Sequence, residues 1–424
     1  MASTYLQRTP SGAGNRKTWT WSGWIKTATT SGDKGIFSAS TDASNRNAIN
    51  LSNEGYFLFD YEVGGTRNVV SSQSATYRDI NGWYHLVVAV DTTQATDTNR
   101  VKMYVNGSQI TLTGVVNSYP SQNADMFVNN TVSHSIGRQD WGTNYFNGSM
   151  SHVHFIDGTA YTPSAFGETD ATTGEWKINT SPSVTYGTNG FFILKDGNSV
   201  TDQSGNSNNF TVGGGTLTKT EDNPSNVFAT LNPLNLQTGT KPILQYGNTS
   251  VSGASDGGTE FNGSSTLGMS TGKFYMEFKS TVSSNVHTMI GITSNPSEDA
   301  RSDHWMGTQS YSYGYYANDG KYYNGNTAYT YGNTYTSDII GVALDLDNNK
   351  LYFSKNGTWQ NSGVPTSGST GTGAISITDN EYFFGVSDAS GTYISSGDCN
   401  FGNGYFGTTA VSSAGTNASG IGIF

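Results

Sequence analysis

Val101-Lys102-Met103-Tyr104-Val105-Asn106-Gly107 indicates a β-hairpin, because an apolar segment runs directly into a two-residue turn. Asn-Gly supplies the two positive-φ residues of the type I′ turn that joins the strands of a tight hairpin. The pattern returns in the second half of the chain as Lys350-Leu351-Tyr352-Phe353, with the turn at Asn356-Gly357. An apolar segment ending in Asp precedes each copy, at 87–91 and 341–345. One hairpin device used twice predicts two β-sandwiches.

The segment Thr18-Trp19-Thr20-Trp21-Ser22-Gly23-Trp24-Ile25 alternates polar and bulky residues with period two. Side chains two apart on a strand share a face, so Trp19 and Trp21 are expected together in a sandwich core.

Composition agrees with an all-β fold. Only 12% of the 424 residues are charged and 34% are hydrophobic, whereas the chain has 53 glycines and 25 tyrosines. A chain rich in Gly, Ser, Thr, Asn and Tyr favours short strands joined by tight turns over amphipathic helices.

Charge and cysteine usage exclude several classes of function. With 21 basic and 32 acidic residues the net charge is −11, which argues against nucleic acid and against polybasic membrane attachment. No apolar stretch is long enough for a membrane helix. The one cysteine, Cys399, is expected to be a partly buried, unreactive thiol. The first residues lack an apolar signal core, so no signal peptide is expected. The chain is expected to face outward but has no export signal. A virion protein that is released by cell lysis explains both features, and non-classical secretion explains them equally.

A domain boundary is expected at Gly213-Gly214-Gly215, which gives a first domain of residues 1–215 and a second of 216–424. The second opens with a linker that becomes an edge segment, since its two prolines disfavour a central strand. The chain ends in Ile421-Gly422-Ile423-Phe424, and such an apolar end suggests docking onto a neighbour or a truncated chain.

Two ordered sets of segments resemble known families. Ser135-Ile136-Gly137-Arg138 and the run 145–158, with 83–88 and 101–107, resemble laminin-G-like, concanavalin-A-like jelly rolls over residues 1–215. The second half resembles a SPRY domain, another concanavalin-like sandwich, through the segments 273–278, 289–292, 339–345, 350–357, 382–386 and 400–402. The resemblance implies two consecutive concanavalin-A-like antiparallel β-sandwiches. Such a tandem looks like structural and appendage proteins of marine tailed phages, which implies a virion protein.

No catalytic constellation is expected. The nearest carboxylate pair is Glu168 with Asp170, but Glu175 lies an odd number of residues beyond Asp170 and would face the other way on a strand. His152 and His154 could form half a metal site, but neighbouring residues do not complete it, so packing is the favoured interpretation. We therefore expect no enzyme and no cofactor. The laminin-G resemblance implies one possible exception, a rim calcium at Asp140, whose other interpretation is a turn former.

Tyrosines dominate the candidate binding residues. Tyr offers a flat apolar face and a hydroxyl at low entropic cost, which suits sugar rings and protein partners. The candidates are Tyr311, Tyr313, Tyr315, Tyr316, Tyr322 and Tyr323, together with Trp141 and Tyr145 near Asp140. Tyr329, Tyr331 and Tyr335 continue the same field, and subunit packing or a plain core are the alternatives.

The sequence therefore predicts a bacteriophage virion surface protein: a tail fibre, a tail-associated adhesin or a head fibre that contacts a host-surface glycan or receptor. A purely architectural capsid or tail decoration protein is the first alternative, and a secreted bacterial lectin-like adhesin is the second. Edges without protective Lys suggest pairing in an assembly, so an oligomer or a contact with other virion subunits is expected.

Overall fold

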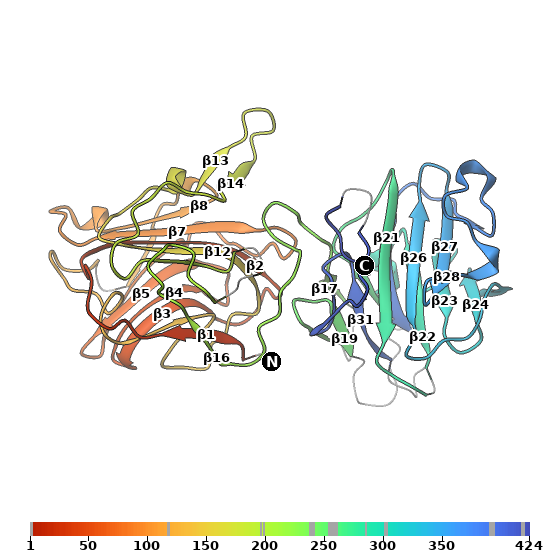
Figure 1. Cartoon of the computed structure of the whole chain (residues 1–424), viewed down its shortest axis with the longest axis horizontal. Helices are drawn as coiled ribbons and strands as arrows, with labels where there is room; N and C mark the ends of the chain where they lie inside the picture. Colours follow the sequence, from red (N-terminus) through yellow and green to blue (C-terminus); the bar gives the residue numbers. More distant parts are fainter. Residues whose placement is uncertain are drawn as a thin grey trace. The chain divides into compact units, whose positions relative to one another are not determined.

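The computed structural model describes residues 3–116, 119–195, 197, 200–236, 242–252, 262–284, 286–300, 304–389, 395–416 and 420–424. The chain forms two compact units (Figure 1). Unit 1 comprises Met1–Lys219 and Asn223–Val227, and unit 2 comprises Thr220–Asp222 and Phe228–Phe424. Each unit is a sandwich of antiparallel sheets, so the predicted all-β fold of two consecutive sandwiches is confirmed. No helix in the described part of the chain is long and apolar enough to cross a membrane.

Unit 1 consists of an eight-stranded and a six-stranded sheet. The eight-stranded sheet has the spatial order β10 (Gly114–Val116), β6 (Thr66–Ser71), β5 (Phe57–Val63), β4 (Asn45–Leu51), β3 (Lys34–Asp42), β11 (Ser133–Ile136), β1 (Tyr5–Arg8) and β16 (Thr211–Gly214). The six-stranded sheet has the order β15 (Phe191–Ile193), β12 (Gly148–Asp157), β2 (Thr18–Thr27), β7 (Tyr84–Asp91), β8 (Val101–Val105) and β9 (Ser108–Gln109). Outside the sheets lie the hairpin β13 (Gly167–Thr169) and β14 (Trp176–Ile178), and the short 3-10 helices Asp97–Asn99 and Pro163–Ala165.

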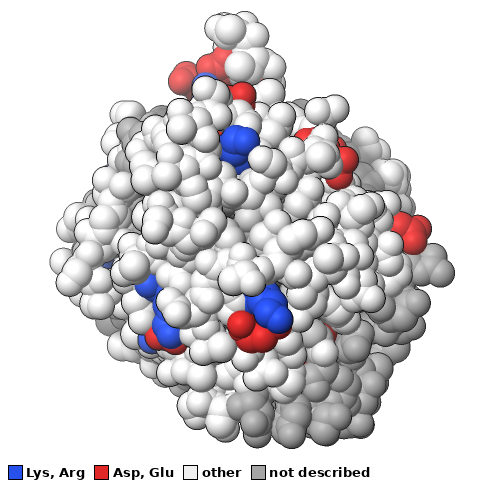
Figure 2. Space-filling model, turned by 90° about the vertical axis from the view of Figure 1, so that its right-hand side faces the viewer, with Lys and Arg blue, Asp and Glu red and all other residues white. Residues whose placement is uncertain are grey.

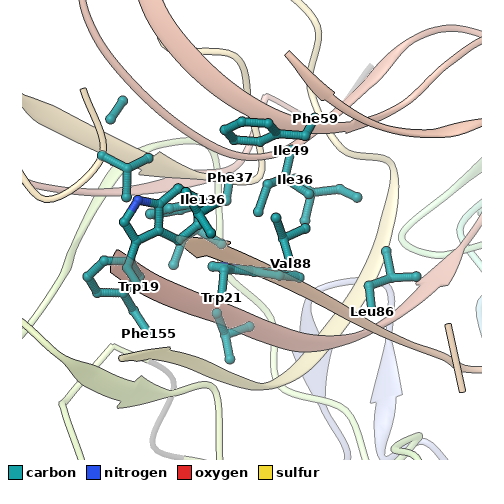
Figure 3. Packing of buried hydrophobic residues seen from close by; sticks show 14 of the residues in the cluster. Trp19, Trp21, Ile36, Phe37, Ile49, Phe59, Leu86, Val88, Ile136 and Phe155 are labelled. Carbon is teal, nitrogen blue, oxygen red and sulfur yellow. The ribbon is translucent and has the colours of Figure 1, made fainter. Parts of the chain in front are cut away.

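Side chains from the two sheets of unit 1 interdigitate in a core dominated by aromatic rings (Figure 3). Trp19 and Trp21 are fully buried, as their alternation predicts. The Trp19 ring centroid lies 5.9 Å from that of Phe59, and the Trp21 ring stacks on Phe37 at 6.3 Å. Gly23 follows on the same face, and a Cβ there would lie 2.7 Å from the Trp21 ring. The missing side chain of Gly23 therefore makes room for the Trp21 indole.

The two Asn-Gly hairpins form as predicted. Asn106 and Gly107 have φ of 47° and 80°, and Asn356 and Gly357 have 48° and 79°, which are the positive values of a type I′ turn. Each asparagine also accepts a hydrogen bond through its side chain from the strand alongside. Asn106 Oδ1 bonds to the backbone N–H of His85 at 2.8 Å, and Asn356 Oδ1 bonds to that of Ile339 at 2.9 Å. The same residue type thus closes the turn and clamps a third strand in both units.

Unit 2 has a seven-stranded and an eight-stranded sheet. The seven-stranded sheet has the order β17 (Leu231–Leu236), β20 (Asn262–Ser265), β30 (Phe383–Asp388), β22 (Thr288–Thr293), β23 (Ser312–Tyr316), β24 (Lys321–Asn324) and β25 (Thr327–Thr330). The other has the order β18 (Ile243–Gln245), β19 (Ser250–Ser252), β31 (Ser396–Asn400), β21 (Lys273–Ser280), β26 (Ile339–Asp345), β27 (Lys350–Lys355) and β28 (Thr358–Trp359), with β29 (Ile375–Ser376) also on β27. The remaining elements are α1 (Pro296–Asp299), the 3-10 helices Gln360–Ser362 and Gly368–Thr370, and the hairpin β32 (Tyr405–Phe406) with β33 (Thr409–Ala410).

The apolar end of the chain, for which the sequence suggested a contact with a neighbour, packs on unit 2 itself. The ring of Phe424 lies 5.0 Å from that of Tyr275 on β21. Asn400 Nδ2 on β31 donates a hydrogen bond to the carbonyl oxygen of Ile423 at 2.9 Å. Cys399, which the sequence predicts to be a partly buried thiol, is fully buried in the core of unit 2, and burial raises the pKa of its thiol.

Candidate functional site

Asp140 lies on the outer face of the eight-stranded sheet of unit 1, in the loop of residues 138–145. Its Oδ1 accepts hydrogen bonds from Ser135 Oγ at 2.8 Å and from Arg138 Nη2 at 2.8 Å. Its Oδ2 accepts one from Ser40 Oγ at 3.1 Å, and Ser38 Oγ accepts one from its backbone N–H at 2.9 Å. Asp140 therefore anchors the loop to β3 and β11.

These contacts do not fit the calcium ion expected at Asp140. Calcium takes about six to eight oxygen ligands, whereas this carboxylate already faces hydroxyl donors and a guanidinium group. The positive charge of Arg138, 2.8 Å away, opposes a second cation. Within the described ranges, no group of three His, Cys, Asp or Glu side chains is placed to hold a metal ion.

Asp140→Ala is expected to lower the free energy of unfolding of unit 1 by about 2 kcal/mol, because the Arg138 guanidinium loses its partner and the serine hydroxyls lose their acceptor. Urea unfolding monitored by circular dichroism measures this. Adding calcium chloride to the unaltered chain should leave the midpoint unchanged. A calcium-dependent rise in the midpoint that disappears in Asp140→Asn would instead assign Asp140 to a metal.

Trp141 and Tyr145 lie in the same loop and are half-buried. The Arg46 guanidinium, from β4, lies over the Trp141 ring with its carbon 4.5 Å from the ring centroid. Tyr145 packs against Tyr5 of β1, with the ring centroids 6.2 Å apart. The loop backbone packs closely against the backbone of β3 at Gly35. A Cβ on Gly35 would lie 2.4 Å from the loop backbone at residues 138 and 139, so only glycine allows this approach. The structure thus brings Asp140, Trp141 and Tyr145 together on one face.

His152 and His154 both pack against Phe192, with ring centroids 5.6 and 3.9 Å from that of the phenylalanine. The register of β12 against β2 shifts between Ser151 and His154, and His152 has a φ of 48°. The His154 ring stacks on Phe192 at 3.9 Å, and its Nδ1 lies 2.9 Å from the Tyr186 hydroxyl oxygen. Burial lowers the pKa of His154 well below its usual value, so the ring is a neutral packing group.

Glu168, Asp170 and Glu175 all lie in the β13–β14 hairpin. Asp170 Oδ2 accepts a hydrogen bond from Lys177 Nζ at 2.7 Å, and its Oδ1 accepts bonds from the backbone N–H groups of Thr172 and Thr173. The hydrogen bond from Lys177 is the main reason that the pKa of Asp170 lies below its usual range. Asp170 therefore closes a turn and holds a surface ion pair.

The tyrosines of unit 2 divide between the core and the surface. Tyr313 and Tyr315 on β23 point into the core and are 5% and 0% exposed, so neither ring reaches the surface. Tyr315 stacks on Phe353 at 5.1 Å and donates a hydrogen bond to the carbonyl oxygen of Asn333 at 2.5 Å. Tyr331 and Tyr335 are buried in the same core, and Tyr311 is half-buried.

Tyr316 and Tyr323 lie on the opposite face of the seven-stranded sheet. Their ring centroids are 5.8 Å apart, and Tyr323 also packs edge-on against Trp305 at 5.3 Å. The Tyr323 hydroxyl donates to Asp319 Oδ2 at 2.8 Å, and the Tyr316 hydroxyl lies 2.5 Å from His287 Nδ1. Burial and the Asp319 carboxylate raise the pKa of Tyr323 to about 12. Both hydroxyls are therefore engaged within unit 2.

Tyr329 is the exposed part of the field, and it lies with the half-buried Tyr322 on the β24–β25 hairpin, called here the tyrosine hairpin (residues 321–330). The two residues are cross-strand partners, and their rings stack at 4.8 Å with an interplanar angle of 12°. All four residues of β25 are exposed, and Tyr329 is 43% exposed. Tyr329 belongs to the tyrosine-rich segment that the sequence indicates. The alternation of residues did not place it among the leading candidates for ligand binding.

The face of unit 2 shown in Figure 2, on the side of β24 and β28 in Figure 1, carries few charged side chains. Among the ion pairs of unit 2, Lys355 pairs with Asp338 at 3.1 Å and Lys321 pairs with Asp319 at 3.8 Å. Neutral polar and aromatic groups therefore make up most of this face, which suits an uncharged ligand.

Comparisons with known proteins agree with this division into two sandwiches. The model of the concanavalin A-like lectin/glucanases superfamily (Laminin_G_3) matches residues 2–165, and the SPRY domain model matches residues 273–392. No curated protein matches the chain.

Three solved structures are among those to which parts of the chain are similar. The SPRY domain of human HERC1 is 18% identical, with 40% of this chain and 96% of that chain covered and a TM-score of 0.32. The heptameric SAP-like pentraxin from Limulus polyphemus is 17% identical, with 38% and 72% covered and a TM-score of 0.29. A human SPRY domain is 17% identical, with 37% and 94% covered and a TM-score of 0.27. The two family-model matches thus lie in tandem along the chain, the laminin-G-like model of the concanavalin A-like superfamily over residues 2–165 and the SPRY domain model over residues 273–392.

Proposed function

We propose that this chain is a non-enzymatic surface protein of a bacteriophage virion, in a tail fibre, a tail-associated adhesin or a head fibre. It contacts a glycan or receptor on the host surface through unit 2 and touches other virion subunits, without binding nucleic acid or entering a membrane. Lectin-like sandwich folds support a binding role. The net charge of −11 supports the exclusion of nucleic acid.

The tyrosine hairpin carries the proposal. Its exposed ring, Tyr329, stacks on the half-buried Tyr322 and presents a flat apolar surface with a hydroxyl group at the edge of a sheet. The pair is already ordered, so a sugar ring or a receptor loop can pack on it with little loss of side-chain entropy. The surrounding face has few charges (Figure 2), so binding there depends on stacking and neutral hydrogen bonds.

Tyr329→Ala is expected to weaken binding to whole host cells or to their purified surface glycans about tenfold or more, since exposed Tyr anchors often contribute ~2 kcal/mol. Surface plasmon resonance with immobilised host polysaccharide measures it. Tyr246→Ala is the matched control, because Tyr246 is a tyrosine of unit 2 with a similar exposed fraction, 48% against 43%. Equal binding by both variants and the unaltered chain would remove the tyrosine hairpin from the binding surface.

An architectural role is the second candidate, and the exposed edge of β25 favours it. All four residues of this edge strand are exposed and uncharged, and such an edge can pair with a neighbouring chain. Cryo-electron microscopy of the intact particle separates the two roles. A solvent-facing tyrosine hairpin at a distal position supports the adhesin, and a hairpin buried against neighbouring subunits supports the decoration protein. Absence of the chain from every particle would refute both virion roles.

A further inference from the structure

β25 (Thr327–Thr330) is an edge strand of the seven-stranded sheet of unit 2, and no other strand of the described residues pairs with its outer side. Its sequence, Thr-Ala-Tyr-Thr, is exposed throughout and carries no charge. Sheets commonly protect their edges with a proline, a charged side chain or a very short strand. β17, at the opposite edge of the same sheet, contains Pro233, which has no backbone N–H, and the edge strand β28 of the second sheet has only two residues. β25 contains neither a proline nor a charge, so its edge is open to pairing.

The turn before β25 determines which of its backbone groups face outward. Gly325 and Asn326 have φ of 58° and 59°, the positive values of a two-residue type I′ turn that leads into Thr327. The residue pair that flanks such a turn is hydrogen-bonded, and hydrogen-bonded pairs then alternate along an antiparallel ladder. Ala328 and Thr330 belong to the intervening pairs. Their N–H and C=O groups therefore point away from β24, toward the open side of the sheet.

This edge is complementary to a second copy of itself. A twofold axis perpendicular to the sheet brings two copies of β25 together as antiparallel neighbours and keeps the same face of both sheets on the same side. With Ala328 on the axis, the two copies of this residue form a hydrogen-bonded pair and exchange their outward N–H and C=O groups. The N–H of each Thr330 then faces the carbonyl oxygen of Asn326 in the other copy.

Side chains and charges favour the same arrangement. Ala328 has only a methyl group, so two copies of it meet on the axis without steric conflict. Thr327 and Tyr329 of different copies become opposite residues on one face, a β-branched and aromatic pair of the kind that stabilises antiparallel sheets. Lys321, the cross-strand partner of Thr330, lies 3.8 Å from Asp319 of its own chain. The surrounding face carries few charges (Figure 2), so two identical copies meet there without strong repulsion.

We propose that β25 pairs with β25 of a second copy of this chain, with Ala328 on the twofold axis. The two seven-stranded sheets then form one continuous sheet, and the stacked Tyr322 and Tyr329 of both copies lie on the same face. This proposal rests on the pairing role given above to the edge of β25, and it identifies the partner as the chain itself. One short strand from each copy makes a small interface, so self-association is weak in solution and is reinforced where many copies assemble.

Analytical ultracentrifugation of the full chain tests the proposal, at about 0.15 M salt, where the repulsion between two chains of net charge −11 is screened. We expect a monomer–dimer equilibrium with a Kd below about 1 mM. Ala328→Lys and Ala328→Asp should each weaken dimerisation about tenfold or more, because each variant places two like charges opposite each other. An equimolar mixture of the two variants should restore the dimer, because residue 328 faces its own copy and the charges are then opposite.

Leu234→Lys and Leu234→Asp are the matched controls, because Leu234 is 65% exposed on β17, at the opposite edge of the same sheet. Neither should change dimerisation, and circular dichroism checks that all four variants fold. Hydrogen exchange on the unaltered chain gives a readout that needs no variant: residues 327–330 should exchange more slowly as the protein concentration rises.

Three results would overturn the proposal: a chain that stays monomeric up to about 1 mM, a mixture that fails to restore the dimer, or equal effects of the Leu234 and Ala328 variants. A monomeric chain that binds host glycans and loses this binding in Tyr329→Ala overturns the self-pairing alone. The proposed binding function of unit 2 then stays in place.

Discussion

Trp21→Ala is expected to lower the free energy of unfolding of unit 1 by about 3–5 kcal/mol, the range for removing a large aromatic side chain from a packed core. The Trp21 ring is fully buried, stacks on Phe37 of the opposite sheet and fills the space left by Gly23. Its loss leaves a cavity between the sheets that neither backbone can close. Urea unfolding followed by circular dichroism measures the change in unit 1.

Val63→Ala provides the control within unit 1, because Val63 lies on β5 and is 52% exposed. We expect it to change the free energy of unfolding by no more than about 0.5 kcal/mol. Trp21→Phe keeps a ring in the core and should cost less than Trp21→Ala. A loss below about 1 kcal/mol in Trp21→Ala would contradict the packing of Trp21 between the sheets.

The hairpins and the core of unit 1 could be predicted because their signals are local. Asn106-Gly107 and Asn356-Gly357 impose their turn through two residues each, with little help from the rest of the fold. The alternation of Trp19 and Trp21 places both on one face, and rings of that size find enough apolar contact only in the core. Sequence thus indicates features that depend on neighbours along the chain.

The same alternation did not show which tyrosines reach the surface. Tyr313 and Tyr315 share a face, as expected, but that face is the core. The opposite face of β23 is covered as well. Gly291, Gly314 and Gly385 are register partners across β22, β23 and β30, and a Cβ on Gly385 would lie 2.2 Å from Met306 Cε. Met306, which is remote from β30 in the sequence, therefore covers that face of the sheet. The period-two alternation of side chains along β23 cannot reveal such a contact.

The buried polar side chains on the outer face of β4 and β5 were likewise beyond prediction from sequence. Arg46, Asn50 and Asp60 come together through the register of β4 and β5, and the loop that covers them follows β11. The sequence pointed to Asp140 and Trp141 of that loop. The structure shows that Asp140 anchors this loop and that Trp141 packs against Arg46.

Asp299→Asn is expected to change how the free energy of unfolding of unit 2 depends on pH. Asp299 ends the short helix α1, is 2% exposed, and burial raises the pKa of its carboxyl from 3.8 to about 6. Between these values the unfolded chain releases the proton while the folded chain keeps it. The free energy of unfolding therefore falls as pH rises from 4 to 6 and is constant above that. A shift of about 2 pKa units corresponds to ~3 kcal/mol.

Asp299→Asn removes this titration, so its stability relative to the unaltered chain should rise by ~3 kcal/mol between pH 4 and pH 7. Urea unfolding of unit 2 at half-unit pH intervals measures the difference. The half-buried His287 of unit 2, whose pKa is lowered by partial burial, destabilises both proteins equally at acid pH and cancels in the comparison. Glu298→Gln removes a half-buried charge from the same helix and is the matched control. A pH-independent difference for Asp299→Asn would mean that this carboxylate is solvated in the folded protein, and that the surface over β20 and β22 is open to water.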